Sequence, residues 1–481
     1  MKQVFNPYLP SYEYIPDGEP YVFDDRVYVY GSHDKFGGEY FCLNDYVCWS
    51  APVKDLTDWR YEGVIFRKNQ DPLNKEKLNP LFAPDIQKGA DGRYYLYYSV
   101  AGSRITSVAV SDKPAGLYEF YGYVSYPDGR ILGQEKGEDL QFDPGVLLDD
   151  DGQVYLYSGF CPEIPKEQEE QYGKVSQYSH VVKLETDMKT VKEAPKYLIP
   201  SRRSESGTSF EGHGFFEASS IRKLKGVYYF IYSSYLSHEL CYATSKYPDR
   251  GFVYGGTIVS NGDIGLPGIN SPQKAVYYTG NNHGSIVSIG DQWYVFYHRQ
   301  TNGDSFSRQG CAEKIQIHPD GKIPQVEITS FGLNRGPLSG KGTYTAGIAC
   351  SLTSKEGACF YGFDGTETRK KHPYITQSGK DREEQPDQYI ANMQDGAAAG
   401  FKYFDFHNTS KVSVTVRGTG EGILCVTDER QGTIKLAEIP VKPSLTDTDI
   451  SAPLMVSDGK HALYFIYKGS GSIDFIQFKL N

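Results

Sequence analysis

The sequence lacks the features that mark membrane and nucleic-acid-binding proteins. It contains no apolar run near the roughly 18 residues that a membrane-spanning helix needs. It also lacks an excess of positive charge, because 60 Asp and Glu outnumber 50 Lys and Arg, for a net charge of −10. A surface of that sign is poorly suited to a phosphate backbone. We therefore predict that neither a membrane nor a nucleic acid is a partner of this protein.

Cysteine pairs with the spacing of a metal site are absent as well. None of the eight cysteines forms a Cys-x-x-Cys pair, so their spacing predicts no zinc site. The first residues include no apolar stretch of the kind found in a secretory signal peptide. Both features favour reduced thiols in a reducing compartment. We predict a cytoplasmic protein that requires no cofactor.

Tyrosine and glycine, by contrast, are abundant. The chain has 40 Tyr and 51 Gly but only 3 Trp, a composition that favours β structure. A turn followed by a short run of alternating aromatic and aliphatic residues recurs five times, at 23–32, 90–99, 150–159, 223–233 and 289–298. The spacing of these copies leaves room for about four short strands each, the content of a propeller blade.

We therefore predict an all-β protein with a five-bladed β-propeller over residues 1–325. The charged segment 161–177 lengthens one interval and is predicted as an inserted surface loop. A Gly- and Pro-rich stretch lies within a predicted linker, 326–349. Alternating runs beyond it, such as VSVTV and LYFIY, predict a jelly-roll-like β-sandwich over 350–481.

A titratable residue lies about 10 to 12 positions before one tyrosine of every copy. In chain order these residues are Asp17, Asp85, Asp143, Glu217 and His283. The first strand of a blade lies nearest the propeller axis, so equivalent positions at its start converge at one end of the channel. Asp before Pro or Gly is also ordinary turn chemistry. Five recurrences in register nevertheless indicate one common site.

Several carboxylates around a concave aromatic site favour glycoside hydrolysis. That reaction needs a carboxylic acid to protonate the leaving oxygen and a second carboxylate to activate water. Glu217 suits the acid, since its apolar neighbours Phe216 and Ala218 desolvate it and raise its pKa. Asp17, in a polar turn, suits the base, and Asp143 would either tune Glu217 or hold a sugar hydroxyl. A wide separation of acid and base would mean inversion.

These residues resemble the motifs of glycoside hydrolase family 43, the five-bladed propeller β-xylosidases and α-L-arabinofuranosidases. The matching stretches are 6–34, 82–99, 142–152, 215–223, 241–245 and 281–299. The resemblance implies that Asp17 is the general base and Glu217 the general acid. It implies that Asp143 orients the acid and modulates its pKa.

The resemblance also implies supporting roles. Arg299 would contact substrate, and Asp85 and Phe82 of the Phe-Ala-Pro-Asp element would support the site and contact the sugar. His283 would be the axial histidine that faces a central calcium or water cluster in many members. Calcium prefers oxygen ligands, so a structural calcium at His283 is one of two alternatives. His33 would be either a turn residue or part of the pocket wall.

Residues 350–481 resemble a family 6 carbohydrate-binding module, best at 364–368, 389–406 and 462–478. All three Trp of the chain lie before this segment, whereas sugar-binding modules usually present aromatic platforms. The alternative is a sandwich that packs against the propeller without binding sugar.

The leading hypothesis is an inverting exo-acting glycoside hydrolase that releases terminal xylose and/or arabinose from xylan- or arabinan-derived oligosaccharides. The main alternative is a non-catalytic sugar-binding propeller, which has no need of a desolvated Glu217 opposite a second acid. A retaining propeller glycosidase such as a fructosidase would differ in the anomer first formed. A scaffold propeller would have a featureless channel mouth.

Overall fold

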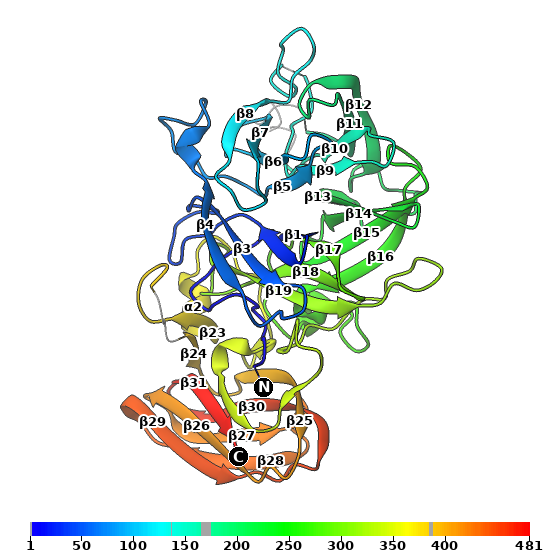
Figure 1. The fold of residues 1–481 in the computed structure, drawn as a ribbon. Helices are drawn as coiled ribbons and strands as arrows, with labels where there is room; N and C mark the ends of the chain where they lie inside the picture. The colour runs from blue at the N-terminus through cyan, green and yellow to red at the C-terminus, as the bar shows by residue number, and fades with distance from the viewer. Residues whose placement is uncertain (1, 136, 165–174, 384–387) are drawn as a thin grey trace.

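Two all-β domains make up the chain, as the sequence predicts (Figure 1). The computed structural model describes all residues except 1, 136, 165–174 and 384–387. The surface loop predicted at 161–177 therefore lies largely outside the described residues. No helix among the described residues is long and apolar enough to cross a membrane.

The first domain is a β-propeller whose five sheets follow one another along the chain (Figure 1). The first four sheets have four strands each and the fifth has three. Their strands are β1 (Glu19–Phe23), β2 (Arg26–Tyr30), β3 (Tyr46–Pro52), β4 (Arg60–Phe66), β5 (Asp85–Lys88), β6 (Tyr94–Ser99), β7 (Thr106–Ser111), β8 (Glu119–Tyr123), β9 (Gly145–Leu148), β10 (Val154–Ser158), β11 (Tyr178–Leu184), β12 (Val191–Pro200), β13 (Phe215–Leu224), β14 (Val227–Ser234), β15 (Glu239–Ser245), β16 (Val253–Ser260), β17 (Ser285–Ile289), β18 (Gln292–Gln300) and β19 (Arg308–Ile315).

The five aromatic runs of the sequence form the second strand of each blade. They pair antiparallel with the first strand through tight turns, as Phe23 pairs with Arg26 in the first blade. Asp24 in that turn has φ 54°, a left-handed conformation that Asp tolerates better than most residues. The second strands are almost wholly buried, with Tyr97 and Tyr157 fully inaccessible. Both faces of these strands are therefore covered in the packed blades.

Contacts between the two ends of the domain close the ring. Gly18 and Gly284 form a parallel bridge between the first and fifth blades. The N-terminal segment runs along the outer strand β19, where the N–H of Tyr8 donates to the carbonyl of Gly310. This closure places the starts of β1 and β17 side by side, which brings Asp17 close to His283.

The second domain is a sandwich of two six-stranded sheets. Its elements are β20 (Leu338–Ser339), β21 (Gly342–Thr345), β22 (Ser351–Thr353), α2 (Thr366–Lys371), β23 (Tyr374–Gln377), β24 (Gln388–Met393), β25 (Ala398–Phe406), β26 (Lys411–Gly418), β27 (Glu421–Thr427), β28 (Lys435–Val441), β29 (Ser444–Pro453), β30 (Gly459–Ser470) and β31 (Ile473–Leu480). Phe401, Phe465, Phe475 and Phe478 contact one another in the core between the sheets. Two strands within the predicted linker, β20 and β21, pair with β25 and β31 and so belong to these sheets.

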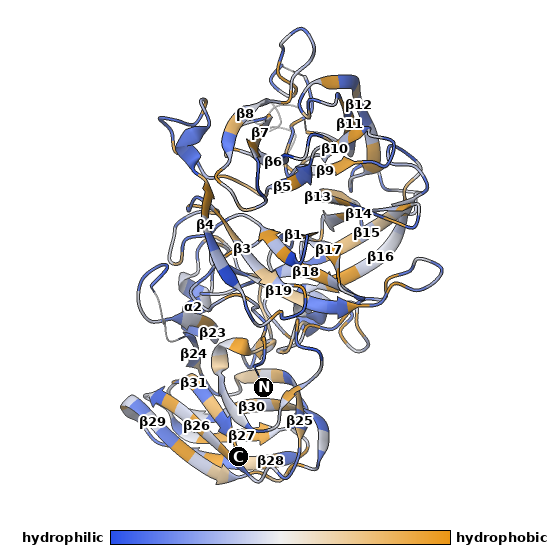
Figure 2. Cartoon of the chain, viewed as in Figure 1, coloured by the Kyte–Doolittle hydropathy of each residue, from blue (hydrophilic) through white to orange (hydrophobic). Residues whose placement is uncertain are grey.

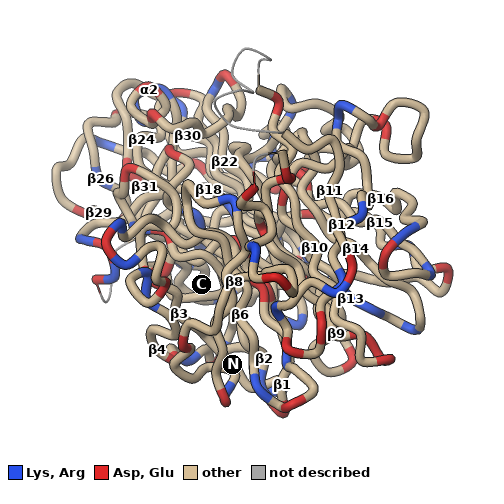
Figure 3. Tube along the Cα trace, turned by 90° about the horizontal axis from the view of Figure 1, so that it is seen from above, with Lys and Arg blue, Asp and Glu red and all other residues tan. Residues whose placement is uncertain are grey.

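Ion pairs join the two domains. Arg382 contacts the buried Glu13 at 2.6 Å, and Lys402 contacts Asp263 at 2.8 Å. Figure 2 shows hydrophobic segments along the strands of both domains and hydrophilic residues in many of the loops between them. Acidic and basic residues are interspersed over the view in Figure 3.

Candidate active site

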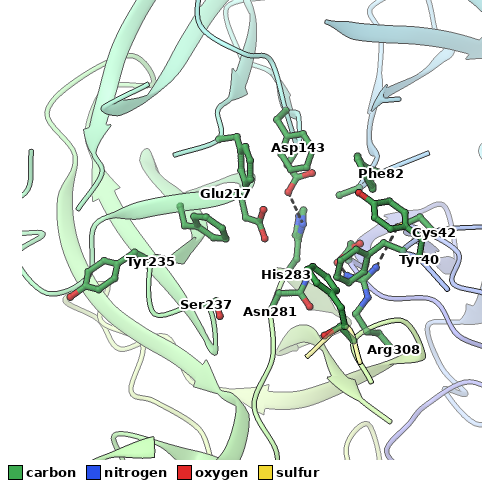
Figure 4. A pocket seen from close by; sticks show the side chains of 18 of the residues that line it. Tyr40, Cys42, Phe82, Asp143, Glu217, Tyr235, Ser237, Asn281, His283 and Arg308 are labelled. Atoms are coloured by element: carbon green, nitrogen blue, oxygen red, sulfur yellow. Dashed lines mark hydrogen bonds and ion pairs between the residues drawn. The ribbon is translucent and has the colours of Figure 1, made fainter. Parts of the chain in front are cut away.

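A cavity of about 560 Å³ lies at the end of the channel where the first strands of the blades begin (Figure 4). Its charged lining consists of Asp17, Asp143, Glu217, His283 and Arg308. Most of the remaining lining is aromatic. The structure thus brings together four of the five titratable residues that recur in the sequence.

The propeller itself sets the positions of these groups. Asp17, Asp143 and His283 each lie two residues before the first strand of their blade, which begins at Glu19, Gly145 and Ser285 respectively. Equivalent places in the chain therefore become neighbouring places around the axis. Glu217 lies within β13, and its side chain is only partly buried.

Asp85 is the exception, because it does not line the cavity as a residue in contact with substrate would. It pairs with Tyr97, as Glu19 pairs with Tyr30 and Gly145 with Tyr157. Asp85 therefore lies one layer deeper in the channel than Asp17. In the second blade, Ala83 has the position equivalent to Asp17 and lines the cavity. The buried Asp85 carboxylate accepts hydrogen bonds from Tyr21 and from the backbone of Val146, which holds neighbouring blades together.

The backbone is strained at the acidic residues. Asp17 has φ 57°, Asp143 has φ 45° and Ala218, next to Glu217, has φ 69°. Non-glycine residues rarely adopt this left-handed region, and each instance costs about 1–3 kcal/mol. In β13 the strain belongs to a bulge, since the register with β14 shifts on both sides of Glu217. A bulge re-aims a side chain, and here it turns Glu217 into the cavity.

Arg308 binds Asp17 and keeps it charged. Its Nη1 donates to Asp17 Oδ1 at 3.0 Å, while Nε and Nη2 donate to the two oxygens of the buried Asp34. Burial alone would raise the pKa of Asp17. The Arg308 guanidinium outweighs burial and holds that pKa well below its ordinary value. Asp17 is therefore a carboxylate at neutral pH, as a general base must be.

His298 holds the backbone of Asp17 in place. Its Nε2 lies 2.8 Å from the carbonyl of Asn281, which can only accept, so Nε2 carries the proton. Its Nδ1 then accepts the backbone N–H of Asp17 at 3.2 Å. Burial lowers the pKa of His298, which keeps the ring neutral.

Glu217 favours the protonated form, in contrast to the ionised Asp17. Burial raises its pKa to about 8, and the negative charge of Asp143 adds to this effect. Asp143 Oδ2 lies 3.5 Å from Nδ1 of His283 (Figure 4). Burial would lower the pKa of His283, but the hydrogen bond and charge of Asp143 raise it to about 9. Burial also raises the pKa of Asp143, while the hydrogen bond with His283 opposes that rise. At neutral pH Glu217 is therefore protonated beside the paired Asp143 and His283.

Two other predicted contact residues lie outside the cavity lining. His33 is buried, with Nε2 2.9 Å from Glu13 and Nδ1 2.8 Å from the carbonyl of Asp45, so it is not part of the pocket wall. Arg299 donates to the carbonyls of Gly347 and Ala349 at the second domain. In both cases an adjacent residue serves the site instead: Asp34 binds Arg308, and His298 binds the backbone of Asp17. Successive side chains along an extended chain point to opposite sides, so only one of each pair can face the site.

The aromatic lining includes Phe82, as predicted from its place before Asp85. Its ring contacts Phe142 at 5.5 Å, Phe142 contacts Phe160 at 4.9 Å, and Phe160 contacts Phe216 at 5.3 Å. The four rings form a continuous arc along blades two to four. Figure 4 shows Phe82 and Tyr40 on the side of the cavity near Arg308. An apolar wall with few polar groups is typical of a small-ligand site.

The residues around His283 do not fit a calcium ion. Calcium takes six to eight oxygen ligands, whereas His283 offers a ring nitrogen, and its Nδ1 lies 3.5 Å from Asp143 Oδ2. Deeper in the channel, the carboxylate of Glu19 already has a cation. Arg222 lies there, with Nη2 2.6 Å from Glu19 Oε2. We therefore derive no catalytic step through a metal at this point.

A second group of metal-ligand residue types lies in the fourth blade. The ligand atoms of His213, Glu239 and Cys241 lie within 4.8 Å of one another. Glu239 accepts hydrogen bonds from Ser234 and Thr257 and contacts His213 Nδ1 at 2.7 Å. Burial raises the pKa of the Cys241 thiol well above its ordinary value. The cluster is thus a satisfied hydrogen-bond network.

The chain is similar to known proteins in sequence and in structure. The sequence model described as glycosyl hydrolases family 43 matches residues 14–323. A xylosidase/arabinosidase of Thermoclostridium stercorarium is 54% identical over 479 residues, which cover 100% of this chain and 99% of that protein.

Two solved structures have the same fold. An arabinoxylan arabinofuranohydrolase of Bacillus subtilis, in complex with cellotetraose, superposes with a TM-score of 0.51 at 21% identity, covering 98% of this chain and 96% of its own. A Xanthomonas citri enzyme complexed with xylose gives a TM-score of 0.52 at 24% identity, covering 68% and 93%. The first likeness extends over both domains. The chain belongs to glycosyl hydrolases family 43.

Proposed function

We propose that this protein is an inverting, exo-acting glycosidase that releases terminal xylose and/or arabinose from xylan- or arabinan-derived oligosaccharides. The observation that carries the proposal is that two carboxyl groups with opposite surroundings line one cavity, Asp17 bound by Arg308 and Glu217 without a cation partner among the described residues. Glu217 holds its proton up to a pKa of about 8, whereas Arg308 keeps Asp17 ionised. These are the states that a general acid and a general base need before the reaction begins.

In the proposed reaction, Glu217 donates its proton to the glycosidic oxygen as the bond to the anomeric carbon breaks. Asp17 takes a proton from a water molecule, whose oxygen attacks that carbon from the opposite face. Asp143 and His283 stay paired and hold Glu217 in place through the backbone of Ala218. The product sugar then carries the inverted configuration.

The substrate class follows from the relatives and the cavity together. The Thermoclostridium stercorarium relative is a xylosidase/arabinosidase of nearly the same length, and the Xanthomonas citri structure contains xylose. A volume of about 560 Å³ accommodates one or two pentose rings. A sugar-binding propeller without activity is disfavoured, since binding alone does not require a protonated Glu217 beside Asp143.

The test uses aryl β-D-xylopyranoside and aryl α-L-arabinofuranoside with the wild type, Glu217→Gln and Asp17→Asn. Both variants are expected to lose about 10²–10⁴-fold in kcat, the usual contribution of general acid–base catalysis. The ratio of the two wild-type rates identifies the preferred sugar. NMR of the first-formed anomer tests inversion, and retention would contradict the assignment of Asp17 as base. Binding of xylotriose without any turnover would support the sugar-binding alternative.

A further inference from the structure

Two aromatic residues of the second domain line the active-site cavity. Phe360 and Phe363 contribute to its lining together with the catalytic carboxyl groups. Phe360 is 61% exposed and Phe363 is 71% exposed. Large apolar side chains that remain this accessible inside a cavity are surfaces that a ligand covers.

Backbone hydrogen bonds fix the segment that carries these two residues. Tyr361 donates its N–H to the carbonyl of Thr279 at 2.9 Å, and Thr279 donates to the carbonyl of Cys359 at 3.1 Å. Ser305 donates its N–H to the carbonyl of Gly362 at 3.2 Å. The segment is therefore joined to the propeller on two sides, which sets both aromatic rings in place.

The helix that follows reinforces this attachment. Arg369 of α2 contacts the buried Asp304 at 2.5 Å and donates from Nε to the carbonyl of Asn302 at 2.7 Å. Asn302 in turn accepts a hydrogen bond from Thr376 of the second domain at 2.9 Å. The loop between β18 and β19 is thus held by the second domain, and β19 begins with Arg308.

A chain of ring contacts connects Phe363 to the base. Phe363 stacks on Phe306 at 5.5 Å with an interplanar angle of 5°, and it meets Phe41 edge-on at 5.8 Å. The Arg308 guanidinium lies 4.8 Å from the centre of the Phe41 ring. Arg308 holds Asp17. The aromatic surface therefore begins next to the reacting centre and continues onto the second domain.

We infer that Phe360 and Phe363 bind the leaving-group saccharide, so that the second domain sets the preference for oligosaccharides. The inference rests on the proposed function. The sugar being released must place its anomeric carbon between Asp17 and Glu217, and the rest of an oligosaccharide then extends toward the exposed part of the cavity. A pyranose ring has an apolar C–H face that packs on an aromatic ring. The second domain is on this view part of the catalytic unit.

The experiment compares substrates with and without a leaving-group sugar. Wild type, Phe360→Ala and Phe363→Ala are measured on xylotriose and on β-D-xylosyl fluoride, with an arabinoxylo-oligosaccharide and α-L-arabinofuranosyl fluoride in parallel. Each variant is expected to raise KM for the oligosaccharide about tenfold, as for the loss of one aromatic contact. The KM for the fluoride is expected to stay within about twofold, since its leaving group reaches neither ring.

Two further variants separate binding from a structural effect. Phe363→Tyr keeps the ring and is expected to restore the KM for xylotriose. Leu445→Ala removes a 90% exposed apolar residue from β29 of the same domain and is expected to leave both KM values and the melting temperature unchanged. An unchanged KM for xylotriose in both alanine variants, or an equal rise for the fluoride, would overturn the inference.

A binding measurement keeps this test independent of turnover. In the Glu217→Gln background, calorimetry compares xylose with xylotriose before and after Phe363→Ala. The inference predicts that only xylotriose binding weakens, by about tenfold. If the wild type hydrolyses no pentoside yet this difference is found, the proposed function fails and the aromatic surface stands. If the wild type is active and the difference is absent, only the inference fails.

Discussion

The backbone N–H of Ala218 donates to Oδ2 of Asp143 at 3.2 Å. Asp143 is therefore bound to the residue that directly follows Glu217, the proposed acid. This bond spans the third and fourth blades and stabilises the bulge that aims Glu217 into the cavity. The charge of the same carboxylate raises the pKa of Glu217. Asp143 therefore contributes to both the position and the pKa of Glu217, the proposed acid.

Replacing Asp143 by Asn should move the alkaline limb of the pH–activity profile to lower pH. Glu217 must be protonated to act, and its pKa of about 8 sets the pH at which activity falls. Removing the neighbouring negative charge lowers that pKa, by about one unit for a contact of this kind. Loss of a charge-assisted hydrogen bond should also reduce kcat/KM about 10- to 100-fold.

The measurement is kcat/KM across pH 5 to 10 for wild type and Asp143→Asn. Asp149→Asn serves as the matched control. Asp149 is also buried, but its carboxylate binds Lys223 and Tyr228 in the turn region of the blades, away from the cavity. An alkaline limb that stays in place in Asp143→Asn would contradict the role assigned to its charge.

Replacing Arg308 by Met should move the acidic limb to higher pH. Asp17 must be ionised to act, and the Arg308 guanidinium holds its pKa well below the ordinary range. Without that cation, burial dominates and the pKa rises, so activity is lost at a higher pH as the solution is acidified. Breaking a buried ion pair also lowers the free energy of unfolding, by about 3–5 kcal/mol.

Arg299→Met is the control for Arg308→Met. Arg299 is equally buried but binds carbonyls of the second domain. It should lower stability while leaving the pH profile unchanged. If Arg308→Met does not fold, Arg308→Lys keeps the positive charge and should show an intermediate shift of the acidic limb. Identical acidic limbs in the wild type and both Arg308 variants would show that this cation does not set the pKa of Asp17.

The fold could be predicted because its signal is local and repeated. Turn residues followed by alternating aromatic and aliphatic residues specify a hairpin, and five such hairpins at similar intervals specify a ring of blades. The fold class and the family are confirmed. The positions of Asp17, Asp143, Glu217 and His283 in one cavity follow from the same repeat, since each lies within a first strand or two residues before one.

The remaining site residues depend on distances that local patterns do not specify. Asp85 lies two residues beyond the position equivalent to Asp17. An offset of two residues keeps a side chain on the same face of a strand but moves it about one layer along the propeller axis. Arg308 follows a loop after β18, and its partner Asp34 is far away in the chain. No local signal could pair them. Phe363 reaches the cavity only through the docking of the second domain.

Chelation should leave this enzyme active and equally stable. His283 is paired with Asp143, and the deeper carboxylate of Glu19 is paired with Arg222. The positive charge that the channel needs is therefore supplied by side chains. Activity and melting temperature should be the same within error after dialysis against EDTA and after addition of calcium. A loss of activity on chelation that calcium reverses would refute this assignment.

Replacing Ala218 by Gly should stabilise the protein while reducing its activity. Ala218 has φ 69°, a conformation that glycine adopts without the steric cost of a Cβ. Relief of that cost is expected to raise the free energy of unfolding by up to about 1 kcal/mol. The bulge then becomes more mobile, so Glu217 is held less firmly and kcat should fall severalfold. Ala109→Gly is the matched control, because Ala109 is fully buried in β7 and lies outside the residues with positive φ.

The control should lose about 1 kcal/mol or more, since glycine in a strand interior adds entropy to the unfolded chain and removes packing. Chemical denaturation of the three proteins gives the stabilities, and kcat on an aryl glycoside gives the activity. Equal destabilisation by both substitutions would mean that Ala218 carries no backbone strain. A more stable Ala218→Gly protein with reduced kcat would show that the strain at this bulge is retained because it positions the acid.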